Sequence, residues 1–95
     1  MNDDHLELSI VIPCLNEEDT VGLCIEKAFS NLKKLKINGE VILSDNGSSD
    51  KSVSIAQNKG AKIVNVKNKG YGAALKAGIE KSKGKYILFA DADNS

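Results

Sequence analysis

The chain has 95 residues, which is enough for one small domain with a modest hydrophobic core. Its formal net charge is zero and 41% of its residues are hydrophobic, which argues against both a general nucleic-acid-binding protein and a disordered segment. All 13 basic residues are Lys, so no Arg is present to hold a phosphate through two parallel hydrogen bonds.

Two further features of the composition indicate a cytoplasmic protein. The spacing of Cys14 and Cys24 fits neither a zinc site nor a disulfide framework, and indicates two reduced thiols. The polar residues 1–5 do not resemble a signal peptide, and no apolar run reaches the roughly 20 residues of a membrane span.

The first half of the chain predicts two strands, each followed by a helix. The β-branched residues within 6–12 predict a buried strand that Pro13 ends. Asn16 is expected to cap the next helix, whose apolar residues recur at helical spacing as far as Leu35. A second short strand follows at 41–43, and the polar turn 45–50 leads into a helix that Gly60 ends.

The second half repeats this alternation. Residues 63–66 predict a third strand, a glycine-containing loop at 68–72 precedes a third helix, and the apolar run 86–90 predicts a buried fourth strand. Strands that alternate with helices in this way are joined by right-handed crossovers and lie parallel. We therefore expect an α/β fold, a Rossmann-like three-layer α/β/α arrangement with a mostly parallel sheet.

A polar cluster follows each predicted strand. The four clusters lie at 16–17, 45–46, 67–69 and 91–93. Ligands of open parallel sheets bind beyond the carboxyl ends of the strands, and these four ends lie at the same edge of the sheet. The sequence therefore predicts a ligand site at this edge.

Asp91 and Asp93 are the most informative of these residues. Two carboxylates one residue apart, just past a strand, can converge on Mg²⁺ or Mn²⁺, and such a metal suits a diphosphate. A helix cap or an Asx turn would use the same residues. A phosphotransferase of the haloacid dehalogenase type, with Asp91 as nucleophile, is a further alternative, although its motif normally ends the first strand and not the fourth.

The other clusters each allow a functional and a structural interpretation. Glu17 could contact a nucleoside or simply favour a helix N-terminus. Asp45 is expected to accept a hydrogen bond from a base or ribose, while 48–50 form a turn. In the loop, Gly70-x-Gly72 lacks the third glycine of a dinucleotide fingerprint, because Leu75 occupies that position. Its glycines suit close approach of an anion and close helix–sheet packing about equally.

Four motifs, taken in order, carry a resemblance over residues 8–93. They are Ile10-Val11-Ile12-Pro13-Cys14-Leu15-Asn16-Glu17, Asp45-Asn46-Gly47-Ser48-Ser49-Asp50, Asn68-Lys69-Gly70-Tyr71-Gly72-Ala73-Ala74 and Phe89-Ala90-Asp91-Ala92-Asp93. Together they resemble the nucleotide-binding half of a family 2 glycosyltransferase with the GT-A fold. The pattern is most similar to the dolichol-phosphate mannosyltransferase and polyprenyl-phosphate glycosyltransferase branch, whose members take part in glycan or cell-envelope biosynthesis.

This resemblance implies a UDP- or GDP-linked sugar donor, a divalent metal (Mg²⁺ or Mn²⁺), and a glycan or polyprenyl-phosphate acceptor. It also implies that the full-length protein works in the cytoplasm or at the cytoplasmic face of a membrane. The implied site residues are Pro13, Leu15 and Glu17 around the nucleoside, Asp45 on the base, Lys69 near the phosphates or base, Asp91 near the ribose and metal, and Asp93 on the metal. It assigns no catalytic residue within this chain.

Two departures from the family pattern qualify these expectations. Asn46 stands where the family commonly carries a second Asp. The chain also ends at Ser95, so residues 1–95 are expected to be the donor-binding half of a domain, truncated after Asp-x-Asp. A fragment, a truncated gene and a subunit completed by another chain all remain open. The isolated chain is expected to be inactive and to self-associate through an uncovered sheet edge. A non-catalytic nucleotide-sugar-binding module is the alternative function.

Overall fold

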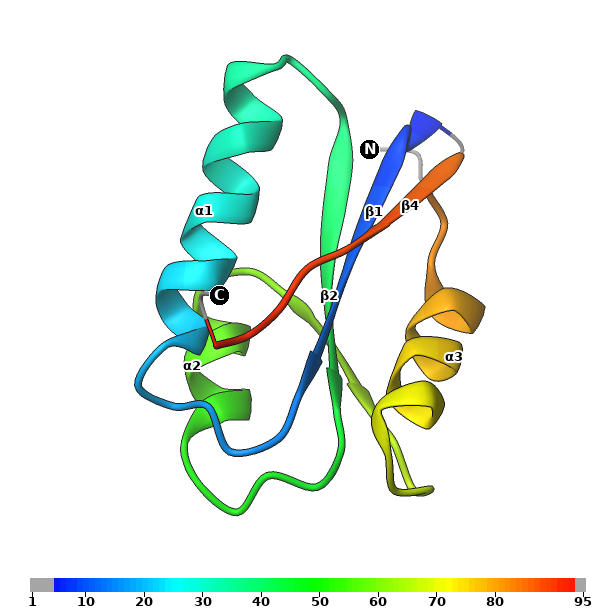
Figure 1. Cartoon of the computed structure of the whole chain (residues 1–95). Coiled ribbons are helices and arrows are strands. Elements are labelled where there is room, and N and C mark those ends of the chain that lie inside the picture. Colours follow the sequence, from blue (N-terminus) through cyan, green and yellow to red (C-terminus); the bar gives the residue numbers. More distant parts are fainter. Residues whose placement is uncertain (1–4, 94–95) are drawn as a thin grey trace.

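A computed structural model describes residues 5–93 and contains a four-stranded parallel sheet in the order β3-β2-β1-β4 (Figure 1). The elements are β1 (Leu8–Cys14), α1 (Val21–Lys34), β2 (Gly39–Asp45), α2 (Ser52–Asn58), β3 (Lys62–Asn65), α3 (Tyr71–Lys81) and β4 (Tyr86–Phe89). Helices α1 and α2 lie on one face of the sheet and α3 lies on the other. The predicted three-layer α/β/α fold with a parallel sheet is confirmed.

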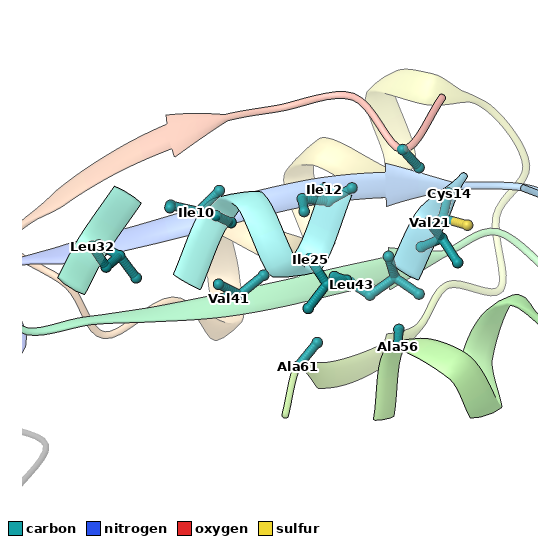
Figure 2. Packing of buried hydrophobic residues seen from close by; sticks show 12 residues of the cluster. Ile10, Ile12, Cys14, Val21, Ile25, Leu32, Val41, Leu43, Ala56 and Ala61 are labelled. Carbon is teal, nitrogen blue, oxygen red and sulfur yellow. The ribbon is translucent and has the colours of Figure 1, made fainter. Parts of the chain in front are cut away.

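The main core lies between the two central strands and helices α1 and α2. Ile12 of β1 and Leu43 of β2 are fully buried, and they pack with Ile25 of α1 and Ala56 of α2 (Figure 2). This packing explains the near-continuous apolar runs of β1 and β2, because a parallel strand in the middle of a sheet is covered on both faces.

Pro13 does not end β1, contrary to the prediction. The strand continues to Cys14, and Pro13 lies in register with Ser44 of β2. The carbonyl of Val11 accepts from Ala90 N on the β4 side, whereas that of Cys14 accepts from Asn46 N on the β2 side. Backbone groups alternate along a strand, so the nitrogen of Pro13 faces the β4 side. The β1–β4 pairing ends at Val11 and Phe89, so the missing N–H of Pro13 interrupts none of its residue pairs.

Asn16 does not cap α1, so this prediction is wrong. The helix begins at Val21, with Thr20 at the N-cap position. Asn16 has a φ of 53°, and its Oδ1 accepts hydrogen bonds from the backbone N–H of Ser49 at 2.8 Å and Asp50 at 3.3 Å. The side chain of Asn16 therefore connects the loop after β1 to the loop after β2. A local sequence pattern does not reveal such a contact between loops.

Strand β4 is not buried, although its composition predicted that it would be. It is an edge strand, and Tyr86, Ile87, Leu88 and Phe89 are 38–64% exposed. Within residues 5–93, α1 and α3 pack mainly over the central strands and leave β4 largely uncovered (Figure 1). The apolar run thus matches the pattern of a covered strand, but none of the described helices provides the cover.

Candidate functional site

A cleft of about 730 Å³ lies at the carboxyl edge of the sheet. Segments that follow all four strands line it, as the sequence predicted. The lining residues are Pro13, Cys14, Leu15, Asn16 and Glu17 after or at the end of β1, Asn46 and Gly47 after β2, Val66, Lys67, Lys69, Gly70, Tyr71 and Ala74 from the β3–α3 segment, and Asp91, Ala92 and Asp93 after β4. The volume falls within the range of small-molecule sites.

The segment 91–93 is held by its middle residue. Ala92 is 4% exposed and belongs to the hydrophobic core, and its carbonyl accepts a hydrogen bond of 2.7 Å from Thr20 Oγ1. Asp91 and Asp93, on either side of it, are exposed and line the cleft. The buried Ala92 therefore anchors a short segment on which both acids border the cleft.

The donor set of this segment fits one kind of metal site. In the described part of the chain, no group of three or more His, Cys, Asp or Glu side chains could hold a metal ion. Mg²⁺ and Mn²⁺ are commonly bound by one or two carboxylates together with substrate phosphates. Asp91 and Asp93 therefore fit a metal that is held jointly with a phosphate ligand.

Lysines and glycines form the other end of the cleft. Lys67, Lys69 and Gly70 lie on the segment between β3 and α3, and both lysine side chains are exposed. Gly70 has a φ of +117°, a conformation that favours glycine. A Cβ added at Gly70 or Gly72 would meet no atom within 4 Å, so close helix–sheet packing does not explain these two glycines.

Asp45 is placed differently from its neighbour Asn46. Asp45 is 3% exposed and is not among the residues that line the cleft. Its Oδ2 accepts from Gly47 N at 3.2 Å and Ser48 N at 2.9 Å, and its Oδ1 accepts from Ser48 Oγ at 2.6 Å. The predicted contact of Asp45 with a base stays a prediction.

Asn46 is a cleft residue that sequence reasoning did not select. Its side-chain amide makes hydrogen bonds to the backbone of the β3–α3 segment. Its position in the sequence was one available signal for a role in the cleft. Asn46 directly follows the second strand, and its neighbour Asp45 is of a type that often bonds within a tight turn. Sequence alone could not decide which of the two adjacent polar residues, Asp45 or Asn46, lines the cleft.

The loops after β1 and β2 are tied together by hydrogen bonds. Ser48 Oγ accepts from Asn16 N at 2.9 Å, and Ser52 Oγ accepts from Glu17 N at 2.8 Å. Asp50 Oδ2 accepts from Glu18 N at 3.1 Å. The turn residues thus fix the loop that carries Leu15 and Glu17 into the cleft.

Two groups near these loops have shifted pKa values. Burial raises the pKa of the Cys14 thiol, and the nearby Asp45 carboxylate adds to this shift. Cys14 is therefore protonated at neutral pH and inert as a nucleophile. The hydrogen bond from the Ser52 hydroxyl lowers the pKa of Asp50, so the carboxylate that supports the first loop is ionised at neutral pH.

The sequence of the chain matches a known family over almost its whole length. The family described as "Glycosyl transferase family 2" matches residues 9–95. This chain therefore belongs to glycosyl transferase family 2, which confirms the resemblance drawn from the four motifs.

Similar proteins lie in the predicted branch. The low-salt glycan biosynthesis hexosyltransferase Agl6 of Haloferax volcanii is 41% identical over 86 residues, which are 90% of this chain and 21% of that protein. The human dolichyl-phosphate beta-glucosyltransferase is 36% identical, over 94% of this chain and 32% of its own length.

A similar solved structure shares the fold. Glucosyl-3-phosphoglycerate synthase from Mycobacterium tuberculosis, in complex with Mn²⁺, UDP and phosphoglyceric acid, aligns with a TM-score of 0.76 and 30% identity. The alignment covers 92% of this chain and 33% of that one. The chain thus spans a third or less of the length of these three proteins. Within residues 5–93, no helix is both long and apolar enough to cross a membrane.

Proposed function

We propose that this chain is the donor-binding part, residues 1–95, of a glycosyltransferase that transfers a sugar from a UDP- or GDP-linked donor. One observation carries the proposal: a single cleft brings together Asp91 and Asp93 at one end and Lys67 and Lys69 at the other. Apolar side chains between them, including Leu15, suit a nucleoside. The family membership and the UDP complex of a similar structure support it.

The arrangement of the strands suggests how a nucleotide lies in the cleft. Asp91 and Asp93 follow β4, whereas the lysines follow β3, at the opposite edge of the sheet. Three strand spacings of about 4.8 Å separate these edges by roughly 14 Å. We place the diphosphate at Asp91 and Asp93, the nucleoside along Pro13, Leu15 and Glu17, and the base toward Lys69, with Asp45 as a further base contact.

A divalent metal would be held by Asp91 and Asp93, and it would supply charge neutralisation for the diphosphate leaving group. Asp91 would also lie near the ribose. The chain's own residues bind and orient the donor. Thr20 and the buried Ala92 fix the two carboxylates, and the hydrogen-bonded loops after β1 and β2 fix the nucleoside wall.

The proposal extends to the acceptor and the location. A polyprenyl phosphate is the proposed acceptor, because the human relative is a dolichyl-phosphate glucosyltransferase. A cytoplasmic location, or the cytoplasmic face of a membrane, is proposed because the spacing of Cys14 and Cys24 in the sequence does not indicate a disulfide framework. We also propose that the isolated chain self-associates through β4, whose apolar side chains and unpaired backbone lie at the sheet edge.

Calorimetric titration with UDP and with GDP, with and without Mn²⁺, tests the proposed donor site. We expect one nucleotide to bind in a metal-dependent manner, and Asp93→Ala to abolish the metal dependence. Circular dichroism serves as the control that wild type and variant are folded. Binding of neither nucleotide to the folded wild type would exclude the donor site, and binding without metal dependence would favour a non-catalytic binding module.

A further inference from the structure

The side chain of Asn46 is bonded at both ends to the segment between β3 and α3. Its Nδ2 donates to the carbonyl of Asn68 at 3.0 Å and to that of Gly70 at 3.4 Å. Its Oδ1 accepts from Gly70 N at 2.9 Å. Its own backbone N–H donates to the carbonyl of Cys14 at 2.9 Å. Asn46 thus connects the end of β1, the end of β2 and this segment.

The segment that Asn46 holds is part of the cleft wall. Lys69, Gly70 and Tyr71 all line the cleft, and Gly70 has the positive φ noted above. Residues 67–70 are exposed and belong to no helix or strand. Such a segment has little packing to fix it, so hydrogen bonds decide where Lys69 lies.

In this chain, an amide side chain matches all three contacts at position 46. The three bonds require two donations and one acceptance from the same planar group, and among side chains of this length only Asn supplies both. Exchanging O and N would set an oxygen against the carbonyls of Asn68 and Gly70, so the contacts fix the orientation of the amide. An Asp at position 46, which the family commonly carries, would keep the bond that it accepts from Gly70 N but could not make the two donations to Asn68 and Gly70.

We propose that Asn46 is a positioning residue, which acts on the nucleotide through Lys69 by holding the β3–α3 segment against the end of β2. This inference rests on the proposed function, because it concerns the base end of the same donor site. The bonds are made within the chain itself, so the segment is ordered before the nucleotide binds. Pre-ordering of this kind lowers the entropic cost of binding.

Residue-resolved amide hydrogen exchange on the 95-residue chain, without nucleotide, tests the first half of the proposal. We expect the Gly70 N–H to be protected in wild type and to exchange faster in Asn46→Ala, which removes the acceptor of this N–H and both donations. Asn68→Ala is the matched control, because it removes an amide side chain from the segment itself, while the Asn46 bonds use only the backbone of residues 68 and 70. A rapidly exchanging Gly70 N–H in wild type, or unchanged exchange in Asn46→Ala, would overturn the proposal.

A double-mutant cycle on nucleotide affinity tests the second half. With UDP or GDP and Mn²⁺, we expect Asn46→Ala and Lys69→Ala each to weaken binding by about tenfold. If Asn46 acts through Lys69, the double variant should lose far less than the product of the two factors. Losses that multiply would show that Asn46 contacts the nucleotide independently. If wild type binds neither nucleotide, the proposed function fails, while the exchange of Gly70 still decides whether Asn46 holds the segment.

Discussion

Helix α3 approaches the sheet closely at Gly78. A Cβ at this position would overlap Val11 Cγ1 and lie 2.6 Å from Ser44 Oγ. Both of these neighbours are fully buried strand residues and cannot move away cheaply. We therefore expect Gly78→Ala to lower the free energy of unfolding by about 1–3 kcal/mol, measured by urea denaturation.

Gly72 provides the control within the same helix. A Cβ there would meet nothing within 4 Å, and Ala is a better helix former than Gly. Gly72→Ala should leave the stability unchanged or raise it slightly. Equal destabilisation by both substitutions would contradict the packing explanation for Gly78.

Glu40 is a buried carboxylate at the amino end of the sheet, far from the cleft. It is 6% exposed and accepts hydrogen bonds from Ser9 Oγ at 2.6 Å, Lys62 Nζ at 2.6 Å and the backbone N–H of Lys83 at 2.7 Å. Burial alone would raise its pKa, but the bonds from these three donors outweigh it, so the pKa is lowered. Glu40 thereby joins β1, β2 and β3 to the α3–β4 connection.

The lowered pKa of Glu40 predicts the pH dependence of stability. Because the folded pKa lies below the unfolded value of about 4.3, the contribution is complete above that pH and is lost as pH falls through the folded pKa. We expect Glu40→Gln to lower the free energy of unfolding by about 1–3 kcal/mol at pH 7. In urea titrations the difference from wild type should shrink below about pH 4. A difference that stays constant down to pH 3 would show that the charge is not responsible.

At the scale of elements, β4 combines an open sheet edge with exposed apolar side chains. Leu88 is 52% exposed on this strand, and Leu23 is 48% exposed on α1. If the strand edge drives self-association, sedimentation of wild type should depend on concentration, and Leu88→Lys should remain monomeric. Leu23→Lys, which changes a leucine of similar exposure on a helix, should behave like wild type. A wild type that is monomeric at all concentrations would exclude this association.

The order of the elements could be predicted because it depends on local patterns. Apolar runs identified all four strands, and the polar residues after them gathered at one edge as parallel topology requires. The predictions for Pro13, Asn16 and β4 were wrong for a different reason: each depends on neighbours that are distant in sequence. These neighbours decide whether a proline fits within β1, what the Asn16 side chain binds, and whether β4 is covered.

The same distinction applies to the candidate site. The sequence identified Asp91 and Asp93 because two acids after a strand form a local pattern. It placed Asn46 in a polar cluster at this edge but did not reveal its role, because the amide is bonded to residues 68 and 70, more than twenty positions away. It likewise did not show that the carboxylate of Asp45 is used within its own turn. Contacts between loops are set by the fold, not by the spacing of residues within a motif.

At the scale of the whole molecule, binding and stability are linked. A ligand that binds only the folded state stabilises it by RT ln(1 + [L]/Kd), which is about 2.7 kcal/mol at a concentration of 100 Kd. For a domain of this size, that corresponds to a rise in Tm of roughly 10 °C or more. Asp91 and Asp93 are the acids that line the cleft near β4, so a metal alone has few protein ligands there.

We therefore expect a non-additive response in thermal unfolding followed by circular dichroism. Mn²⁺ alone should change the Tm of the chain very little, whereas the nucleotide and Mn²⁺ together should raise it by roughly 10 °C at saturating concentration. In Asp93→Ala, adding Mn²⁺ to the nucleotide should have no further effect. A large rise in Tm with Mn²⁺ alone would contradict a jointly held metal, because it would require a complete metal site within the protein itself.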